Sequence, residues 1–589
     1  MIKPANPMPS KHEYIEALQT ATACLLEENG YSAAVATQRA PSQLRNIASQ
    51  LLCVRSPSEK DAEQLSSVLY DSVDVVLAFE ANRKTLIDAQ SLRCFGDSRI
   101  VLWKGDITTL KTDVIVNAAN SALLGCFKPD HKCIDNIIHA NAGPRLRDAC
   151  AKVVLGLAEP DGLPVGQAAA TPGFHLPAHT VFHTVGPQIQ RNTLPTDLQN
   201  NQLVSCYLNC LDLALTLAIP TLSIAFPCIS TGLYGFPSER AAPLVIQAVK
   251  IWIATHPQAS NWKVIFNTFL DKDHTLYSNH LLELIPDSFI PPQPSTLPQQ
   301  FQKAKELMRN ADYLIVSAGA GLSASAGLDY TSAQVFQNHH PVMHARGFNN
   351  MYQFIGYQSW TPALQWGYLF SQTRLARYSW PQHATQQSYP LLKTLIDDFE
   401  KRTTASTFIV TSNADGMFNQ YGFEKSRIYT RQGDYSRIQC LQPCSNTSVW
   451  DILPFLEKGL EYLDPTTNEI TNPDAIPKCC NCDGPVMLNV RGGDWFIETE
   501  YLKQKMVFEA WKAGVLHKVK TEGKKLVVLE LGAGFNTPGV LRYPNEKLAE
   551  EVDGVALVRL NRDHAEIPVL ADGVGVNADC TDVLKELTL

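Results

Sequence analysis

The sequence predicts two α/β units of unequal size that follow a helical N-terminal segment. In both halves, short apolar runs end in Gly, Asn or Asp, as expected for buried parallel strands that bring polar residues to one edge of a sheet. Five prolines fall within residues 285–298 and favour an extended spacer between the halves. The chain has 589 residues, and by length alone the prior is about three to four domains.

The first 90 residues are expected to form a helical extension. Residues 13–28 and 58–79 are amphipathic, and we find no catalytic group among them. We therefore expect residues 1–90 to pack against the unit that follows, at residues 91–284.

Three apolar strands of that unit are followed by polar or small residues. They are expected at residues 100–103, 111–117 and 222–226. The first two lead to Asp106 and Asn120, and the third leads into residues 228–236. Backbone N–H groups in such a loop of small residues can surround phosphates.

A possible metal-binding segment follows Asn120. Cys126, His131 and Cys133 form a Cys-x4-His-x-Cys pattern, and three protein ligands with one open position are how catalytic zinc is held. The alternative is that the two cysteines are buried thiols and the histidine lies on the surface.

These motifs resemble the macrodomain family, which binds ADP-ribose. The resemblance implies a mixed sheet flanked by helices. It places Asp106 at the adenine amino group, Asn120 at the distal ribose, and residues 230–235 around the pyrophosphate. The full set expected around ADP-ribose is Asp106, Ile107, Asn120, Gly143, Ser230, Thr231, Gly232, Tyr234, Gly235 and Phe236.

The Cys–His–Cys segment is similar to that of the zinc-dependent macrodomains, which also carry an N-terminal extension. This resemblance implies zinc beside the distal ribose and removal of ADP-ribose from modified proteins. Asp135 stands where macrodomain hydrolases without zinc place an acid/base carboxylate, so Asp135 and Asn120 are the candidate catalytic residues. His139, at helical spacing from Asp135, is expected to pack in the interior.

Residues 299–589 predict a doubly wound parallel sheet. Its strands are expected at residues 312–317, 407–410, 526–531 and 556–560. Each ends in Gly, Asn or Asp, and the carboxyl edge of such a sheet is where dinucleotides bind. The first strand leads into the glycine-rich turn 318–327, where glycines let the backbone approach a pyrophosphate.

Four cysteines of this unit have the spacing of a structural zinc site. Cys440 and Cys444 form C-x3-C, and Cys479 and Cys482 form C-x2-C. They predict a small zinc-ribbon lobe near residues 438–490, with Cys480 as a bystander. Reduced core cysteines are the alternative.

The turn Gly319-Ala-Gly-Leu-Ser323, the Asn413-x-Asp415 segment, the late Gly-x-Gly-x-Asn-Thr and the cysteine quartet resemble the sirtuin family. The NAD-binding residues implied are Gly319, Ala320, Gly321, Ser323, Gly327, Asn413, Asp415, Gly532, Gly534, Asn536 and Asn561. Two features depart from the family: residues 328–331 replace its proline and Asp-Phe-Arg, and Gln432 replaces its catalytic histidine.

Gln432 changes the chemistry that this unit can perform. A deacylase needs the histidine to deprotonate a ribose hydroxyl, and a glutamine side chain cannot act as a general base. Asn413 followed by Gln432 resembles the class M sirtuins, which implies protein ADP-ribosyltransferase activity with Asn413 and Gln432 holding the nicotinamide ribose. A degenerate site that only binds NAD is the alternative.

Composition excludes some partners. The net charge of −8 and the lack of a basic stripe disfavour nucleic acid. The most apolar stretch, residues 211–229, is interrupted by prolines and polar residues, so no membrane span is expected. The N-terminus shows neither a secretory nor a mitochondrial signal pattern, and the 15 cysteines fit a reducing compartment. We expect a cytoplasmic protein, with mitochondria as the alternative.

Together the two resemblances imply reversible protein ADP-ribosylation with NAD as the substrate, and the cysteine and histidine motifs predict two zinc ions per chain. The second unit would attach ADP-ribose to a protein acceptor and the first would remove it. By family resemblance the acceptor would be a lipoyl-carrier protein. The alternatives are an NAD-dependent deacylase fused to an O-acetyl-ADP-ribose deacetylase, and a non-catalytic sensor of both nucleotides.

Overall fold

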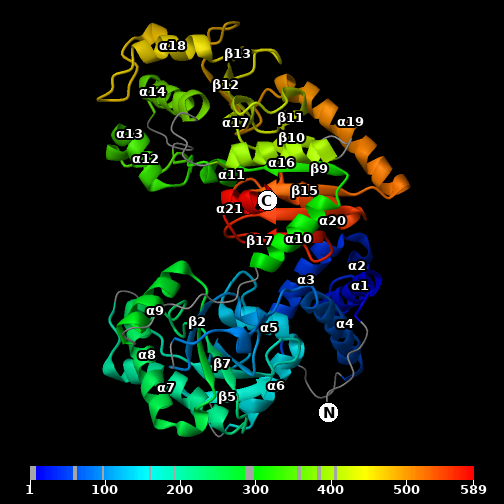
Figure 1. Ribbon diagram of the computed structural model, residues 1–589, viewed down its shortest axis with the longest axis vertical. Coiled ribbons are helices and arrows are strands. Elements are labelled where there is room, and N and C mark those ends of the chain that lie inside the picture. The colour runs from blue at the N-terminus through cyan, green and yellow to red at the C-terminus, as the bar shows by residue number, and fades with distance from the viewer. Residues whose placement is uncertain are drawn as a thin grey trace. The chain divides into compact units, whose positions relative to one another are not determined.

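The computed structural model describes residues 8–57, 63–95, 98–157, 159, 161–190, 193–284, 297–353, 360–380, 387–402 and 407–588. The chain forms two compact units, Met1–Thr296 and Leu297–Leu589 (Figure 1). Most of the predicted spacer, residues 285–296, lies outside the described residues.

The N-terminal extension is helical, as predicted. It consists of α1 (Lys11–Glu28), α2 (Val35–Gln38), α3 (Pro41–Val54) and α4 (Glu63–Ala81). Helix α1 begins with a capping box, in which Ser10 and Glu13 satisfy each other's backbone N–H groups. The buried face of α1 packs against α3 and α4, so the extension has a small core of its own.

A mixed six-stranded sheet forms the centre of the first unit. Its order is β2-β8-β7-β4-β6-β5, and only the edge strand β5 is antiparallel to its neighbour. The strands are β2 (Ile100–Lys104), β8 (Lys263–Thr268), β7 (Ser223–Phe226), β4 (Val114–Ala119), β6 (Thr180–Val185) and β5 (Ala168–Pro172). Their nearly continuous burial is typical of a sheet covered on both faces.

Helices cover both faces of this sheet. Side chains of α7 (Asp197–Leu215), α8 (Ser238–Thr255) and α9 (Asp271–Leu284) form one core. Side chains of α5 (Ile134–Ala142) and α6 (Pro144–Leu155) contribute to the other. A short pair of strands, β1 (Ile87–Asp88) and β3 (Leu110–Lys111), lies outside the main sheet.

The second unit contains a fully parallel sheet of order β11-β10-β9-β15-β16-β17. The strands are β9 (Tyr313–Ala318), β10 (Thr407–Thr411), β11 (Ile428–Thr430), β15 (Leu526–Leu531), β16 (Val555–Leu560) and β17 (Asp572–Val576). The chain adds strands to one side of β9 and then to the other. The strand order therefore reverses between β9 and β15, which is where doubly wound sheets bind ligands.

The two faces of this sheet carry different helices. Helices α10 (Leu297–Arg309), α16 (Ser388–Arg402) and α21 (Cys580–Thr588) contribute to one core. Helices α19 (Thr499–Glu522) and α20 (Arg542–Glu551) contribute to the other.

A smaller lobe of the second unit is built on a three-stranded antiparallel sheet. Its strands are β12 (Gly433–Cys440), β13 (Val449–Asp451) and β14 (Val486–Val490), in the order β13-β12-β14. The helices here are α14 (Pro362–Thr373), which continues into a π-helical turn at Arg374–Ser379, and α18 (Leu453–Glu461). The remaining short helices of this unit are α11 (Ala320–Ser325), α12 (Ala333–His339), α13 (Pro341–Ala345) and α17 (Met417–Gln420).

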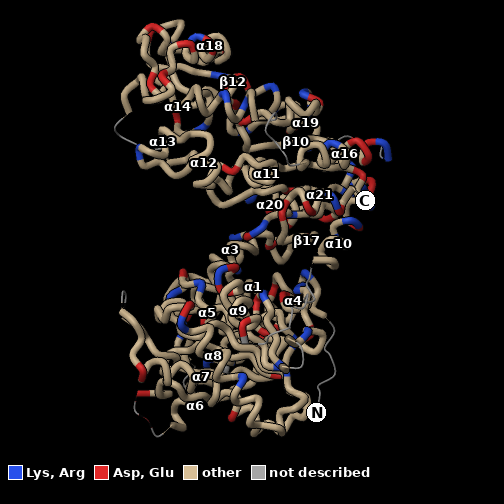
Figure 2. The backbone as a smooth tube through the Cα atoms, turned by 60° about the vertical axis from the view of Figure 1, so that its left-hand side comes forward, with Lys and Arg blue, Asp and Glu red and all other residues tan. Residues whose placement is uncertain are grey.

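Basic and acidic residues are interspersed along both units (Figure 2). Over the part of the chain that the structure describes, every helix is too short or too polar to cross a lipid bilayer.

Candidate active sites

The first candidate site begins where strand β4 ends. Asn120 follows β4, and its Nδ2 donates a hydrogen bond to the carbonyl oxygen of Gly125 at 2.9 Å. Its Oδ1 is buried without a partner among the described residues. A buried acceptor without a partner is costly unless a ligand or water satisfies it, so Asn120 is suited to bind a polar ligand.

Two of the three predicted metal ligands are adjacent in the loop after Asn120. Cys126 Sγ lies 3.4 Å from His131 Nδ1, close to the roughly 3.5 Å that tetrahedral Zn–S and Zn–N bonds impose on two ligands. Cys133 directly precedes α5 and is partly buried. Burial, with the neighbouring Cys126 and Asp135, raises the pKa of Cys133 to about 11. The donor types of Cys126, His131 and Cys133 fit zinc.

Asp135 lies on the first turn of α5 and is buried. Burial raises the pKa of its carboxyl to about 6, although the hydrogen bond from Asn117 opposes this shift. That bond runs from Asn117 Nδ2 to Asp135 Oδ1 at 2.8 Å. Asn117 is itself fully buried within β4, and its amide nitrogen also lies 3.2 Å from His183 Nδ1. Asn117 thus orients Asp135, a role that the sequence pattern did not reveal.

The loop after β7 has the form expected of a phosphate-binding segment. Ser230 adopts a left-handed φ of 64°, and its Oγ is buried without a partner among the described residues. Gly235 has φ 71° and donates its N–H to Gly232, while the space beside Gly232 is open. Thr231 Oγ1 donates to the carbonyl oxygen of Cys228 at 3.0 Å, which closes the turn.

Tyr234 of this loop is partly buried. Burial raises the pKa of Tyr234, and the nearby charges of Asp135 and Cys126 raise it further.

The other residues predicted to contact ADP-ribose differ in burial and in their neighbours. Asp106 Oδ1 accepts a hydrogen bond from the Thr108 N–H at 2.9 Å, and Ile107 is buried. Phe236 is only 1% exposed and belongs to the core beneath the loop. Gly143 has φ 90°, and a Cβ there would lie 2.8 Å from Leu77 of α4. The structure thus gives this glycine a packing function against the extension.

A third group of metal-type side chains lies in the interior of this unit. The ligand atoms of His139, Cys150 and His183 lie within 4.8 Å of one another, and all three residues are buried. Thr171 Oγ1 lies 2.8 Å from His183 Nε2, and burial lowers the pKa of His183 to about 3. His139 is buried, with its Nε2 3.5 Å from Asp135 Oδ1, and its expected packing role stays a prediction.

The second candidate site surrounds the turn between β9 and α11. Asn413, just after β10, donates its Nδ2 to Gly319 O at 3.0 Å and to Ser323 Oγ at 3.1 Å. Ser323 Oγ donates to Asp415 Oδ2 at 2.6 Å and lies 3.1 Å from the Tyr389 hydroxyl. Burial raises the pKa of Asp415. The predicted Asn, Asp and Ser thus form one buried network.

The glycines of this site pack against each other. A Cβ on Gly319 would lie 2.7 Å from Gly532 O, and one on Gly321 would lie 2.6 Å from Gly532 Cα. Ala320, between them, begins α11. These two turns, at the reversal of strand order, can approach only because side chains are absent.

The remaining predicted nucleotide contacts lie around this pair of turns. Asn561, after β16, donates its Nδ2 to Ala533 O at 3.1 Å and so supports the turn after β15. Gly534 and Asn536 are exposed on that turn. Gly327 has φ 92°, a backbone conformation that favours glycine, and a Cβ at this position would lie 3.2 Å from the Trp380 ring.

Gln432 stands directly before strand β12. Its backbone oxygen accepts a hydrogen bond from the Arg491 N–H at 2.9 Å, and its Oε1 is buried without a partner among the described residues. The side-chain amide is thus available to a ligand.

Arg377, which the sequence did not single out, joins the two halves of this site. Its Nη1 donates to Gly416 O at 2.9 Å, and its Nε lies 3.2 Å from Asp434 Oδ1. Gly416 follows Asn413 and Asp415, whereas Asp434 follows Gln432. Arg377 lies in the π-helical turn after α14, and such turns are frequent at functional sites.

Replacing Arg377 with glutamine should lower turnover at this site about 10-fold. Without the Arg377 guanidinium, the two segments that carry Asn413 and Gln432 would no longer be joined, and a small displacement of either side chain lowers the rate of catalysis. Steady-state rates with NAD would measure it. Arg374→Gln, an exposed change in the same turn, is the control, and equal rates for Arg377→Gln and the unchanged chain would contradict the assignment.

The four cysteines of the smaller lobe form a compact cluster. Cys440 Sγ lies 3.8 Å from Cys482 Sγ, and Cys444 Sγ lies 3.6 Å from Cys479 Sγ. Four thiolates around tetrahedral zinc, each about 2.3 Å from the metal, would lie about 3.8 Å apart. All four ligand atoms lie within 4.8 Å of one another, and Cys480 is exposed outside the cluster. The arrangement fits a structural zinc ion.

Replacing Cys479 with serine should remove one zinc ion per chain and destabilise the three-stranded lobe, since structural zinc contributes folding free energy directly. Metal analysis and thermal unfolding would measure both effects. The adjacent Cys480→Ser change should leave zinc content and unfolding temperature unaltered, and a loss of zinc from this control would argue against the ligand assignment.

Two sequence comparisons relate this chain to known proteins. A family model described as Macro domain matches residues 116–245 and confirms the predicted macrodomain. A protein from Fusarium oxysporum f. sp. cubense, described as "Probable bifunctional ADP-ribose hydrolase/ADP-ribosyltransferase", is 39% identical over 526 residues, covering 87% of this chain and 85% of that protein.

Two further comparisons cover the first unit. A "Protein-ADP-ribose hydrolase" from Staphylococcus aureus strain MSSA476 is 43% identical over 209 residues, covering 35% of this chain and 76% of that protein. A solved macrodomain from Oceanobacillus iheyensis with ADP is 35% identical, covers 33% of this chain and 95% of that chain, and gives a TM-score of 0.29.

Proposed function

Because this chain belongs to the family of bifunctional ADP-ribose hydrolase/ADP-ribosyltransferases, we propose that its two units perform opposite steps of reversible protein ADP-ribosylation. The sirtuin-like unit at residues 299–589 transfers ADP-ribose from NAD to a protein acceptor. The macrodomain at residues 91–284, with its extension, hydrolyses that modification. The observation that carries the proposal is the unpartnered amide of Gln432, which can bind the sugar but cannot take a proton from it.

The transfer step exchanges one bond at the anomeric carbon of NAD. Asn413 and Gln432 hold the nicotinamide ribose by hydrogen bonds while the glycosidic bond to nicotinamide breaks. The bonding electrons leave with nicotinamide, and a nucleophile of the acceptor forms the new bond to the anomeric carbon and loses its proton. The buried Asn413–Ser323–Asp415 network fixes the position of Asn413 before NAD arrives.

The removal step breaks the bond between the acceptor and the same sugar carbon. Asp106, Asn120 and the loop from Ser230 to Gly235 bind the ADP-ribose part, and the buried Asn120 Oδ1 and Ser230 Oγ are available for it. Zinc held by Cys126, His131 and Cys133 would lower the pKa of water to about 7. Asp135, oriented by Asn117, would accept a hydrogen bond from the attacking water. The water oxygen bonds to the sugar carbon, the acceptor leaves with the electrons of the broken bond, and the proton that the water loses passes to the acceptor.

Family resemblance favours a lipoylated carrier protein as the acceptor. Full-length chains test this directly. A hydrolase-deficient chain (Cys126→Ala) is incubated with NAD and either a lipoylated carrier or the same carrier without lipoate. Mass spectrometry should show an ADP-ribose adduct on the lipoylated carrier, and a transfer-deficient chain (Gln432→Ala) should then remove it.

The alternatives predict different products in the same assay. Release of O-acetyl-ADP-ribose in a reaction with an acetyl-lysine peptide would show that the second unit is a deacylase and not a transferase. Saturable ADP-ribose binding without formation or removal of any adduct would support the alternative of a non-catalytic nucleotide sensor.

A further inference from the structure

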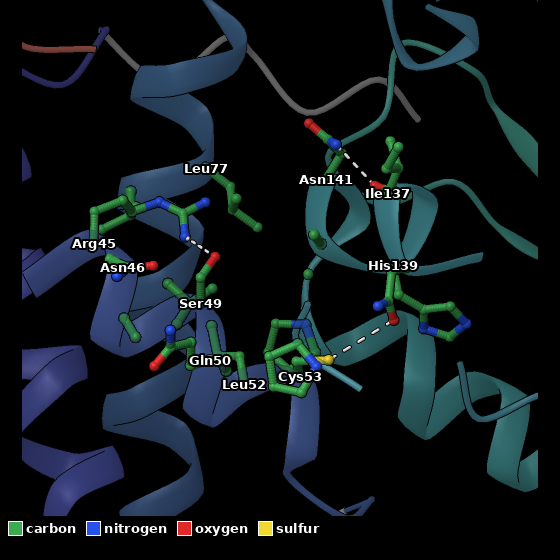
Figure 3. A pocket seen from close by; sticks show the side chains of 18 of the residues that line it. Arg45, Asn46, Ser49, Gln50, Leu52, Cys53, Leu77, Ile137, His139 and Asn141 are labelled. Atoms are coloured by element: carbon green, nitrogen blue, oxygen red, sulfur yellow. Dashed lines mark hydrogen bonds between the residues drawn. The ribbon is translucent and has the colours of Figure 1, made fainter. Parts of the chain in front are cut away.

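The carboxyl end of α3 touches the loop that carries the proposed metal ligands. Cys53 Sγ, at the end of α3 (Figure 3), lies within hydrogen-bond distance of two acceptors, the backbone oxygen of Cys126 at 3.2 Å and Asn136 Oδ1 at 3.7 Å. Asn136 donates in turn to the backbone oxygens of Lys128 and His131, at 2.8 and 2.9 Å. The backbone on both sides of the Cys–His pair is thus bonded to α3 or to a residue that α3 contacts.

Arg147 of α6 makes a second connection between the same two elements. Its Nε donates to Leu124 O at 2.8 Å, and its guanidinium lies 4.7 Å from the centroid of the Phe127 ring. Its Nη atoms donate to Leu52 O at 2.8 Å and to Cys53 O at 3.1 Å. A cation at the last carbonyls of a helix is favourable because these groups lack partners within the helix and carry partial negative charge. One buried side chain therefore fixes both the metal loop and the end of α3.

Packing alone supports this loop poorly. A cavity of about 380 Å³ lies between α3, α4 and α5, and His131 and Lys132 line it together with Ser49 and Leu77 (Figure 3). Since the His131 side of the loop borders open space, its position depends on the few hydrogen bonds from Cys53, Asn136 and Arg147.

We infer that Arg147 and the carboxyl end of α3 are positioning elements of the hydrolase metal site. The helical extension is then part of that site and holds Cys126 and His131 at ligand spacing. This inference rests on the proposed hydrolase function. Arg147 acts through the loop and not on the substrate.

The test compares full-length Arg147→Gln with Arg145→Gln. Arg145 lies on the same helix and binds Asp74 of α4, with its Nη2 2.7 Å from Asp74 Oδ2, so its loss loosens the extension without touching the loop. Zinc retention is measured by competition with a chromophoric chelator, alongside ADP-ribose affinity and hydrolysis. Outer-shell partners of metal ligands are typically worth about 10–100-fold in metal affinity or activity.

Arg147→Gln should weaken retention of one of the two zinc ions by about 10-fold or more and slow hydrolysis, with ADP-ribose affinity unchanged within about twofold. Arg147→Lys should recover part of the loss, because it restores the charge but not the forked donor geometry. Cys53→Ala, a smaller change, should shift zinc retention in the same direction.

Three results would overturn the inference. Zinc retention equal to that of the unchanged chain in both Arg147→Gln and Cys53→Ala would exclude the positioning role. An equal loss of zinc retention in Arg145→Gln would show that the Arg147→Gln effect comes from general loosening of the helical extension. An unchanged chain that holds a single zinc ion and hydrolyses nothing would instead refute the proposed hydrolase, and the inference with it.

Discussion

Replacing Gln432 with alanine should lower the transfer of ADP-ribose to the acceptor about 100-fold. Loss of one preorganised hydrogen-bonding group from an active site commonly costs this order of magnitude. Because the buried Oε1 has no partner among the described residues, removing it should leave the fold unstrained. Initial rates of adduct formation, in a chain that also carries Cys126→Ala, would measure the effect.

Gln432→Asn retains the amide on a shorter side chain and serves as the matched variant. It should show an intermediate rate if reach and hydrogen bonding both matter. Gln432→His should not create a deacylase, since residues 328–331 also differ from the sirtuin pattern. Transfer at the original rate in Gln432→Ala would remove this residue from the mechanism.

Replacing Cys126 with alanine should slow removal of ADP-ribose at least about 100-fold and release one zinc ion per chain. Cys126 is one of the two ligand atoms already at zinc spacing, and catalytic zinc with only two protein ligands is held weakly. Binding of ADP-ribose should persist in part, because Asp106, Asn120 and the loop at 228–236 remain. Calorimetry with ADP-ribose and a hydrolysis assay would separate the two effects.

Cys94→Ala is the appropriate control for thiol loss in this unit. Cys94 is half-buried against the core that contains α5 and α6 and takes no part in the proposed site. Its replacement should leave the zinc content and hydrolysis rate unchanged. Hydrolysis at the original rate in Cys126→Ala would count against metal-assisted removal.

The sequence predicted those features that depend on local patterns. Strand ends rich in Gly, Asn and Asp indicated both sheet edges, and cysteine spacing indicated the cluster of Cys440, Cys444, Cys479 and Cys482. Contacts between distant segments could not be predicted in this way. Arg377 reaches Gly416 and Asp434, and Arg147 reaches α3, across sequence separations that no periodicity records.

The neighbours of glycines could not be predicted from the sequence. A glycine marks a position where the backbone can adopt unusual dihedral angles, but the pattern does not show which group packs against it. Gly143 was expected to lie close to a ligand, yet its nearest neighbour is Leu77 of the extension. Gly319 and Gly321 lie at the predicted turn, and there they make room for the backbone of Gly532. Ligand contacts of these positions stay predictions.

Strand β12 begins immediately after Gln432 and ends at Cys440. One strand therefore connects the proposed sugar-binding amide at one end to Cys440 of the four-cysteine cluster at the other. Loss of metal from the four-cysteine cluster, or oxidation of its thiols, would disturb the strand that leads to Gln432 and should slow attachment of ADP-ribose. Metal starvation should slow removal as well, because the proposed hydrolase site also depends on zinc.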